Sequence, residues 1–222
     1  MHHGHQVRGI QFPMPKLIEH SLTSLASMVR ARKISPVEIV KAQLAQIEKL
    51  NPRLNAIITL APDLLAQARM AEEKPSDRPL HGLPLTVKDT LETAGLRSTS
   101  GSRTRAEYVP TRDAPAVARL RNAGAIILGK TNTAEMAMDY TGDNPVFGRT
   151  NNPHDLTKTP GGSSAGEAVA IATCMSPGGL GSDLAGSIRI PAHFCGIAGL
   201  KPATGYVPVS YTHLTLPTIL RV

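Results

Sequence analysis

The sequence has no tryptophan, and aromatic residues make up only 3% of its 222 residues. Hydrophobic residues nevertheless reach 41%, which is enough to bury a substantial core. That core must be built mainly from Ala, Val, Ile and Leu, as in alanine-rich helices packed on aliphatic strands. The length favours a single domain.

Cysteine is scarce as well. Cys174 and Cys195 form no C-x-x-C pair and have no histidine at ligand spacing, so neither a zinc site nor a disulfide framework is indicated. We expect reduced thiols in a cytoplasmic protein, with Cys195 a buried packing residue rather than a nucleophile. No metal and no organic cofactor is expected.

Long apolar runs and runs of like charge are also missing. No stretch approaches the length that spans a bilayer, and residues 1–20 lack the apolar segment of a signal peptide, so we expect a disordered extension and no membrane partner. The net charge of +7 comes from basic residues scattered between Arg8 and Arg221, without interleaved aromatics. We therefore predict no nucleic-acid partner, and a homodimer stays open.

The first part of the chain predicts helices. Ser35, Pro36 and Glu38 form a capping box with proline at the first helical position, and the helix that follows should end at Asn51-Pro52. An earlier helix is predicted around residues 22–32. A short apolar run at 56–60 and a helix over 62–73 come next.

From Leu83 onward, short apolar runs alternate with helices, which is typical of an α/β layer structure. Strands are predicted at 83–87 and 125–128. Helices are predicted from a cap at Asp113, near Ala134 and over 164–175. The expected fold class is α/β, a mixed β-sheet core flanked by helices.

One motif is a decoy. Residues 124–131, GAIILGKT, match the phosphate-loop pattern G-x-x-x-x-G-K-[ST]. Its four middle residues, Ala-Ile-Ile-Leu, are themselves the best strand nearby, and a strand commits its N–H groups to a sheet ladder rather than to a phosphate. We therefore reject nucleotide binding.

Three segments carry candidate chemistry. GGSSAG (161–166) sets two serines before a helix, GSDLAGSIR (181–189) sets Ser187 before another, and GLPLTVKD (82–89) delivers Lys88 at a strand end. Each of the two serine segments alone is better explained by a tight turn with a serine cap. Their combination is far more specific.

Six segments occur in the order seen in the amidase-signature family, which the chain resembles from about Leu22 to Pro208: GLPLTVKD, GKTNTAEMAMD, NPVFGRTNNPHD, TPGGSSAGEA, GSDLAGSIRIPAHFCG and GLKP. The spacings, 163 − 88 = 75 and 187 − 163 = 24, also fit the family. The resemblance implies that Ser187 is the nucleophile, Ser163 a bridging serine on a cis peptide, and Lys88 the base. Ser164 is then a helix-start residue outside the relay.

The implied chemistry demands a neutral lysine. With an ordinary pKa near 10.4, only about one lysine in 2,500 is neutral at pH 7, so burial must lower the pKa of Lys88. The apolar strand that leads into it is suited to this. A carboxylate of Asp89 pointing inward would oppose the shift.

Attack on a carboxamide creates an oxyanion, which consecutive backbone N–H groups at a helix start would stabilise. The expected donors are Leu184, Ala185, Gly186 and Ser187. Asp183 and Arg189 flank the nucleophile, and we assign them a salt bridge that fixes this loop.

Other candidates are set aside. The resemblance gives His154 and His193 no role, so both are expected to be structural. Glu135 and Asp139 have a helical i, i+4 spacing that could suggest a carboxylate pair, but two carboxylates on a solvated helix face explain them more simply.

The resemblance implies an amidohydrolase that forms an acyl-enzyme on Ser187, acts on a small amide and releases ammonia or an amine. The alternatives are a glutamyl-tRNA amidotransferase A-type subunit within a multi-subunit complex, and a catalytically silent fragment that serves in assembly. Residues 21–209 are expected to form a partial amidase domain, incomplete on its carboxy-terminal side. Residues 210–222 do not resemble the family's continuation and are read as a truncation or scar.

Overall fold

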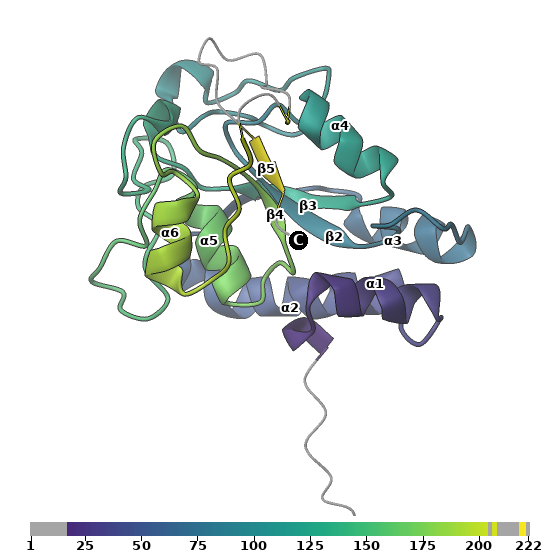
Figure 1. Ribbon diagram of the computed structural model, residues 1–222. Helices are drawn as coiled ribbons and strands as arrows, with labels where there is room; N and C mark the ends of the chain where they lie inside the picture. The colour runs from purple at the N-terminus through teal and green to yellow at the C-terminus, as the bar shows by residue number, and fades with distance from the viewer. Residues whose placement is uncertain (1–16, 204–205, 208–217, 221–222) are drawn as a thin grey trace, which may run out of the picture.

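A five-stranded mixed sheet runs through the computed structural model, which describes residues 17–203, 206–207 and 218–220 (Figure 1). The strand order is β1-β3-β2-β4-β5. The strands are β1 (Ile57–Leu60), β2 (Pro84–Lys88), β3 (Ile126–Thr131), β4 (Gly179–Ser182) and β5 (Thr218–Leu220). The α/β class and the mixed sheet expected from the sequence are confirmed.

Strand direction decides where the site forms. β2 is parallel to both β3 and β4, whereas β1 and β5 are antiparallel to their neighbours. The carboxyl ends of β2, β3 and β4 therefore meet at one edge of the sheet, where side chains from distant parts of the chain can converge. Lys88, Thr131 and Ser182 are the last residues of these three strands.

Helices cover the sheet on both sides. They are α1 (Leu22–Arg30), α2 (Pro36–Leu54), α3 (Leu64–Glu73), α4 (Pro115–Asn122), α5 (Ala165–Ala172) and α6 (Arg189–Cys195), with short 3-10 turns η1 (Leu17–Glu19), η2 (Arg103–Arg105) and η3 (Glu135–Ala137). Figure 1 shows α1 and α2 along one side of the sheet and α4 on the other. The core between them is aliphatic and alanine-rich, as the composition predicts.

The capping box of α2 is confirmed, but the predicted end of the helix is wrong. The Ser35 hydroxyl accepts a hydrogen bond from the Glu38 N–H at 3.1 Å, and the Glu38 carboxylate accepts one from the Ser35 N–H at 2.8 Å. The helix runs through Pro52 to Leu54. Asn55 closes the helix in a left-handed conformation, and its N–H donates to the Asn51 carbonyl oxygen.

Two further predictions need correction. Asp113 does not cap α4, because its carboxylate accepts hydrogen bonds from the Ala94 N–H and the Arg121 guanidinium instead. The helix predicted near Ala134 is only the turn η3, in which Met136 has a φ of 49°. Glu135 and Asp139 therefore do not share a helix face.

The ends of the chain are described only in part. Leu17–Glu19, placed in the amino-terminal extension by the sequence analysis, form η1, which contacts α2. The remaining expectation for residues 1–16 lies outside the described residues. Of residues 210–222 only β5 is described, and it pairs antiparallel with β4.

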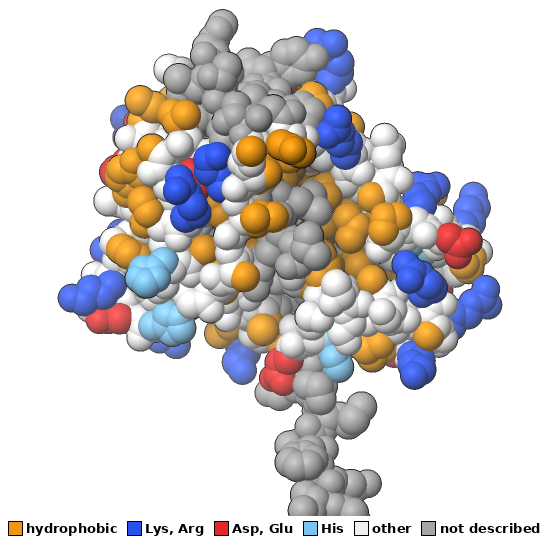
Figure 2. Space-filling model, viewed as in Figure 1, with side chains coloured by type: hydrophobic (Ala, Val, Ile, Leu, Met, Phe, Trp, Pro, Cys, Tyr) orange, Lys and Arg blue, Asp and Glu red, His pale blue; other side chains and the backbone are white. Residues whose placement is uncertain are grey.

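Lysine and arginine side chains are spread over the face seen in Figure 2 in small groups, with hydrophobic and neutral side chains between them. This matches the scattered basic residues of the sequence. No helix in the described ranges combines the length and the apolarity needed to cross a bilayer.

Candidate active site

Lys88 lies at the centre of the candidate site. It is the last residue of β2, its side chain is completely buried, and its Nζ donates a hydrogen bond to Ser163 Oγ at 2.7 Å. A second bond runs to Ser182 Oγ at 2.9 Å. Lys88 and Ser163 are therefore in hydrogen-bond contact, as the resemblance implies, and Lys88 is not a surface residue.

The environment of Lys88 favours the neutral amine. Burial lowers the pKa of Lys88 from 10.5 to about 7, although the carboxylates of Asp183 and Glu167 act in the opposite direction. Asp89, the neighbour named in the sequence analysis, is not among these carboxylates. It lies on the next position of the chain and interacts with Lys130 instead. At neutral pH the Lys88 amine is therefore uncharged in a substantial fraction of the molecules, and in that form it can accept a proton.

Ser163 and Ser164 lie side by side before α5 but do different things. The Gly162–Ser163 peptide is cis, as the resemblance implies, and Ser163 is fully buried against Lys88. Ser164 is the N-cap residue of α5, and its hydroxyl donates to the Ser182 carbonyl oxygen at 3.2 Å. Ser164 thus ties α5 to β4 and makes no contact with the lysine amine.

Ser187 is delivered by the loop between β4 and α6. The Ser164 N–H donates to the Ser187 carbonyl oxygen at 3.0 Å, which holds the backbones of the two serine segments together. Ser187 is 8% exposed, and its hydroxyl has no hydrogen-bond partner among the described residues. Its backbone therefore lies against Ser164, the neighbour of Ser163, and it is slightly exposed to solvent, but the described residues show no hydrogen bond between the Ser163 and Ser187 hydroxyls.

Asp183 organises this loop, as predicted. Its buried carboxylate forms two hydrogen bonds with the Arg189 guanidinium, each 3.0 Å long. It also accepts hydrogen bonds from the N–H groups of Gly186, Ile188 and Arg189. Burial alone would raise the pKa of Asp183, but these donors outweigh it and hold the pKa far below its ordinary value. The carboxylate stays charged and fixed.

One expected oxyanion donor is already engaged. The Gly186 N–H donates to Asp183 at 2.8 Å, so it is not free to meet an oxyanion, and that prediction is corrected. The N–H groups of Leu184, Ala185 and Ser187 have no partner among the described residues. These three are the donors that the loop leaves available.

Sequence reasoning missed two polar residues at the site. Ser182, at the end of β4, gives the Lys88 amine its second hydroxyl partner. Glu167 is buried on the inner side of α5, where the Thr86 and Thr131 hydroxyls donate to its carboxylate. Sequence spacing does not single out either residue. Ser182 and Glu167 come close to Lys88 only when β4 and α5 pack against β2.

The lysine of the rejected phosphate-loop motif, Lys130, lies inside the protein. Residues 126–131 form β3, and Lys130 is fully buried, donating to the Leu91 carbonyl oxygen and to the hydroxyls of Thr93 and Ser98. A lysine held in this way cannot reach a phosphate group.

The other set-aside groups are also accounted for. His154 Nε2 lies 3.1 Å from the Cys195 carbonyl oxygen, which fits a structural histidine, whereas His193 is exposed on α6. Cys195 is buried, and burial raises the pKa of its thiol to about 12, which suppresses the reactive thiolate. Within the described part of the chain no group of three metal-ligating side chains occurs.

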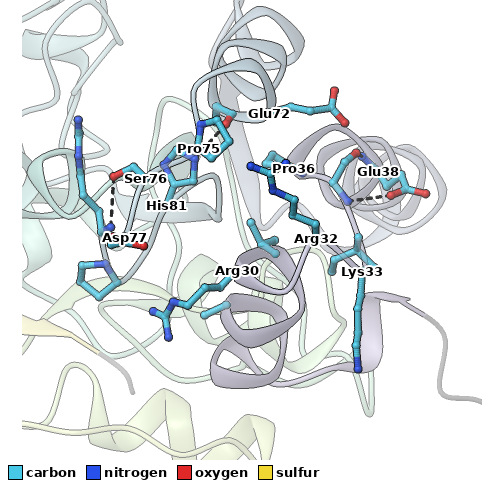
Figure 3. Close-up of a pocket in the computed structure, with 17 residues that line it drawn as sticks. Arg30, Arg32, Lys33, Pro36, Glu38, Glu72, Pro75, Ser76, Asp77 and His81 are labelled. Carbon is cyan, nitrogen blue, oxygen red and sulfur yellow. Dashed lines mark hydrogen bonds between the residues drawn. The ribbon is translucent and has the colours of Figure 1, made fainter.

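A cavity of about 540 Å³ lies elsewhere, between the α1–α2 turn and the segment that leads into β2 (Figure 3). Arg30, Arg32, Glu72 and His81 are among its lining residues. It adjoins the start of β2, whereas Lys88 is at the end of that strand. The cavity is therefore separate from the serine–lysine cluster.

Comparison with known proteins agrees with this geometry. A family model described as Amidase matches residues 38–220, which is most of the chain. The chain belongs to the amidase family. The match reaches into the stretch 210–222 that the sequence analysis placed outside the family.

Curated relatives of the chain include glutamyl-tRNA(Gln) amidotransferase A subunits. The subunit of Dehalococcoides mccartyi is 42% identical over 198 residues, covering 87% of this chain and 41% of the relative. That of Paraburkholderia xenovorans is 46% identical over 193 residues, covering 85% and 39%. The chain therefore spans about two fifths of the length of these relatives.

Solved amidase-family structures share the fold. The native peptide amidase of Stenotrophomonas maltophilia superposes with a TM-score of 0.83 at 36% identity, covering 89% of this chain and 43% of that protein. A 6-aminohexanoate cyclic dimer hydrolase with bound substrate gives 0.80 at 36% identity, covering 90% and 41%.

Proposed function

We propose that this chain carries the serine–lysine machinery of an amidohydrolase that cleaves a carboxamide C–N bond through an acyl-enzyme on Ser187. One observation supports this most strongly: the Lys88 amine is fully buried, has a pKa lowered to about 7, and lies 2.7 Å from Ser163 Oγ. A neutral amine placed there can act as a general base for a serine hydroxyl.

The proposed reaction begins with proton transfer to the lysine. Neutral Lys88 takes the proton of Ser163, Ser163 takes that of Ser187, and Ser187 Oγ attacks the amide carbon. The N–H groups of Leu184, Ala185 and Ser187 stabilise the oxyanion. The C–N bond then breaks, the proton returns through Ser163 to the leaving nitrogen, and ammonia or an amine departs. Water hydrolyses the ester by the same relay.

A fluorophosphonate probe tests the nucleophile. We expect it to phosphonylate Ser187, with loss of fluoride, and Ser187→Ala should abolish labelling. Ser163→Ala should slow labelling strongly because the relay is broken. Ser27→Ala, in an exposed serine of α1, is the matched control and should label like wild type. Equal labelling of Ser187→Ala and wild type would reject the acyl-enzyme. Absence of labelling in wild type would favour the silent-fragment alternative.

A second candidate is an A-type subunit of an amidotransferase, in which ammonia released from glutamine passes to a misacylated transfer RNA. The identity of 42–46% to relatives named as such subunits favours it. Ammonia release from glutamine, measured with and without partner subunits and transfer RNA, separates it from an enzyme that hydrolyses simple carboxamides. Light scattering on the isolated chain would distinguish a homodimer from a monomer that awaits such partners.

A further inference from the structure

Glu167 is a buried carboxylate that the proposed reaction leaves without a task. Glu167 is 5% exposed. It lies on the side of α5 that faces the sheet. The Thr131 hydroxyl donates to its Oε2 at 2.8 Å, and the Thr86 hydroxyl donates to its Oε1. Burying a carboxylate is costly unless the group is hydrogen-bonded and paired with a charge.

The sheet register places this carboxylate next to Lys88. Thr86 is two residues before Lys88 on β2, so both side chains project from the same face. Thr131 is the register partner of Lys88 on β3. The two hydroxyls that hold Glu167 therefore come from the positions adjoining the lysine along its strand and across it.

A gap in β4 makes room for the carboxylate. Gly179 is the register partner of Thr86, and a Cβ at Gly179 would lie only 1.7 Å from Glu167 Oε1. Any side chain at this position would displace the carboxylate. The sheet is thus shaped to admit Glu167 beside the lysine strand.

The charges around Lys88 are few. Asp183 acts on it from the end of β4 and Glu167 from α5, whereas Ser163 and Ser182 contribute uncharged oxygens: two hydroxyls and the Ser182 carbonyl oxygen. Lys130, on β3, also acts on Glu167, and Asp89 acts on Lys130. These are the charged groups that face the pair from the neighbouring elements.

Asp183 and Glu167 differ in how far their charge is already neutralised. Asp183 forms two hydrogen bonds with Arg189, so it acts on Lys88 as one half of an ion pair. Glu167 is held only by neutral hydroxyls, so its charge is balanced by the lysines alone. The protonation state of Glu167 can therefore change the electrostatic potential at the Lys88 amine.

We propose that Glu167 is a positioning residue for the base: its buried carboxylate, held by Thr86 and Thr131, sets electrostatically how readily the Lys88 amine takes and returns the serine proton. This role rests on the proposed function. Burial alone would make the amine too weak a base, and a nearby anion restores part of its basicity. Burial also raises the pKa of Glu167 to about 7, against the hydrogen bonds and the lysine charges, so both groups titrate in the same pH range and are coupled.

The test is the pH profile of Ser187 labelling by a fluorophosphonate between pH 5 and 9. Glu167→Gln keeps the shape and hydrogen-bonding capacity of the side chain but removes its charge. We expect the acid limb of the profile to move to lower pH by roughly 1 unit, since an opposite charge nearby shifts a pKa by about that much or more. Glu135→Gln, the same change at an exposed carboxylate, should leave the profile in place.

The outcomes are distinguishable. Normal wild-type labelling with an unshifted Glu167→Gln profile would overturn the role of Glu167 and leave the acyl-enzyme standing. A wild type that labels at no pH would overturn both. If Glu167→Gln does not fold, Thr131→Val replaces it: loss of one donor makes Glu167 protonate more readily, which should move the profile in the same direction by less. An unmoved profile there would also reject the proposal.

Discussion

At the scale of single residues, Lys88 makes the sharpest prediction. Lys88→Met removes the base and Lys88→Arg replaces it with a guanidinium that stays protonated, so both should lower the rate constant of Ser187 labelling by about 100-fold or more. Labelling reactions at pH 8, stopped at a series of times, measure this rate constant. Near wild-type labelling by Lys88→Arg would mean that Lys88 contributes only a positive charge.

Asp183 gives a stability prediction at the same scale. Asp183→Asn replaces a buried charge that accepts hydrogen bonds from Arg189 and three backbone N–H groups, so the free energy of unfolding should fall by about 2 kcal/mol. Urea unfolding at pH 7 measures the loss. Asp113→Asn is the matched control and should cost less, because the Asp113 side chain is 14% exposed, against 0% for Asp183, and has two partners. Equal costs would contradict the central place of Asp183 in the loop.

Residue motifs were sufficient to predict some contacts but not others. The pairing of Lys88 with Ser163 followed from the resemblance, and that of Asp183 with Arg189 from their positions on either side of Ser187. The catalytic roles of Lys88 and Ser163 remain predictions. Ser182 and Glu167 were missed because their positions depend on which strands become neighbours. The Gly186 donor was wrongly predicted because the Asp183 side chain folds back onto its N–H.

At the scale of elements, the capping box at the start of α2 makes a contribution to stability that can be measured by itself. Ser35→Ala should lower the free energy of unfolding by about 1 kcal/mol, because the capping box loses its hydroxyl. Thermal unfolding followed by circular dichroism measures the effect. Ser27→Ala, which removes a mid-helix hydroxyl bonded to the Thr23 carbonyl oxygen, should be nearly neutral. An equal loss of stability in the two variants would show that the capping hydroxyl of Ser35 stabilises the protein no more than an ordinary helix hydroxyl.

Elements with strong local signals were predicted well, and those that depend on neighbours were not. The apolar runs of β2 and β3 are visible in the sequence, as is the cap of α2. β4 was not predicted, because its sequence, GLGS, has two glycines and little β-propensity. It forms a strand because β2 offers a parallel partner on that side and because glycine leaves room for Glu167.

At the scale of the whole molecule, the buried lysines predict how stability depends on pH. Burial lowers the pKa of Lys88 to about 7 and that of Lys130 to about 8, while the unfolded chain keeps both protons up to about 10.5. Unfolding therefore takes up protons above pH 7, and the free energy of unfolding should rise by about 3 kcal/mol between pH 7 and 9. Above pH 9 the buried Cys195 thiol opposes the rise, because its pKa is raised in the folded state. Urea unfolding at several pH values measures the slope.

Lys130→Met is the internal control for this slope. The variant should be less stable at every pH, because the Leu91, Thr93 and Ser98 oxygens lose their donor. Its rise between pH 7 and 9 should nevertheless be smaller by about a third, since one of the two titrating amines is gone. A flat pH dependence in the unsubstituted chain would show that the lysines remain charged when buried.

The convergence of Lys88 with Ser163 and Ser182 at the edge of the sheet has a consequence for synthesis on the ribosome. The amine emerges 75 residues ahead of its first hydroxyl partner and 94 ahead of its second. Throughout that interval the lysine is solvated and protonated like any other, and no nucleophile exists. The proposed proton relay therefore cannot form until β4, the third of the parallel strands, has paired with β2.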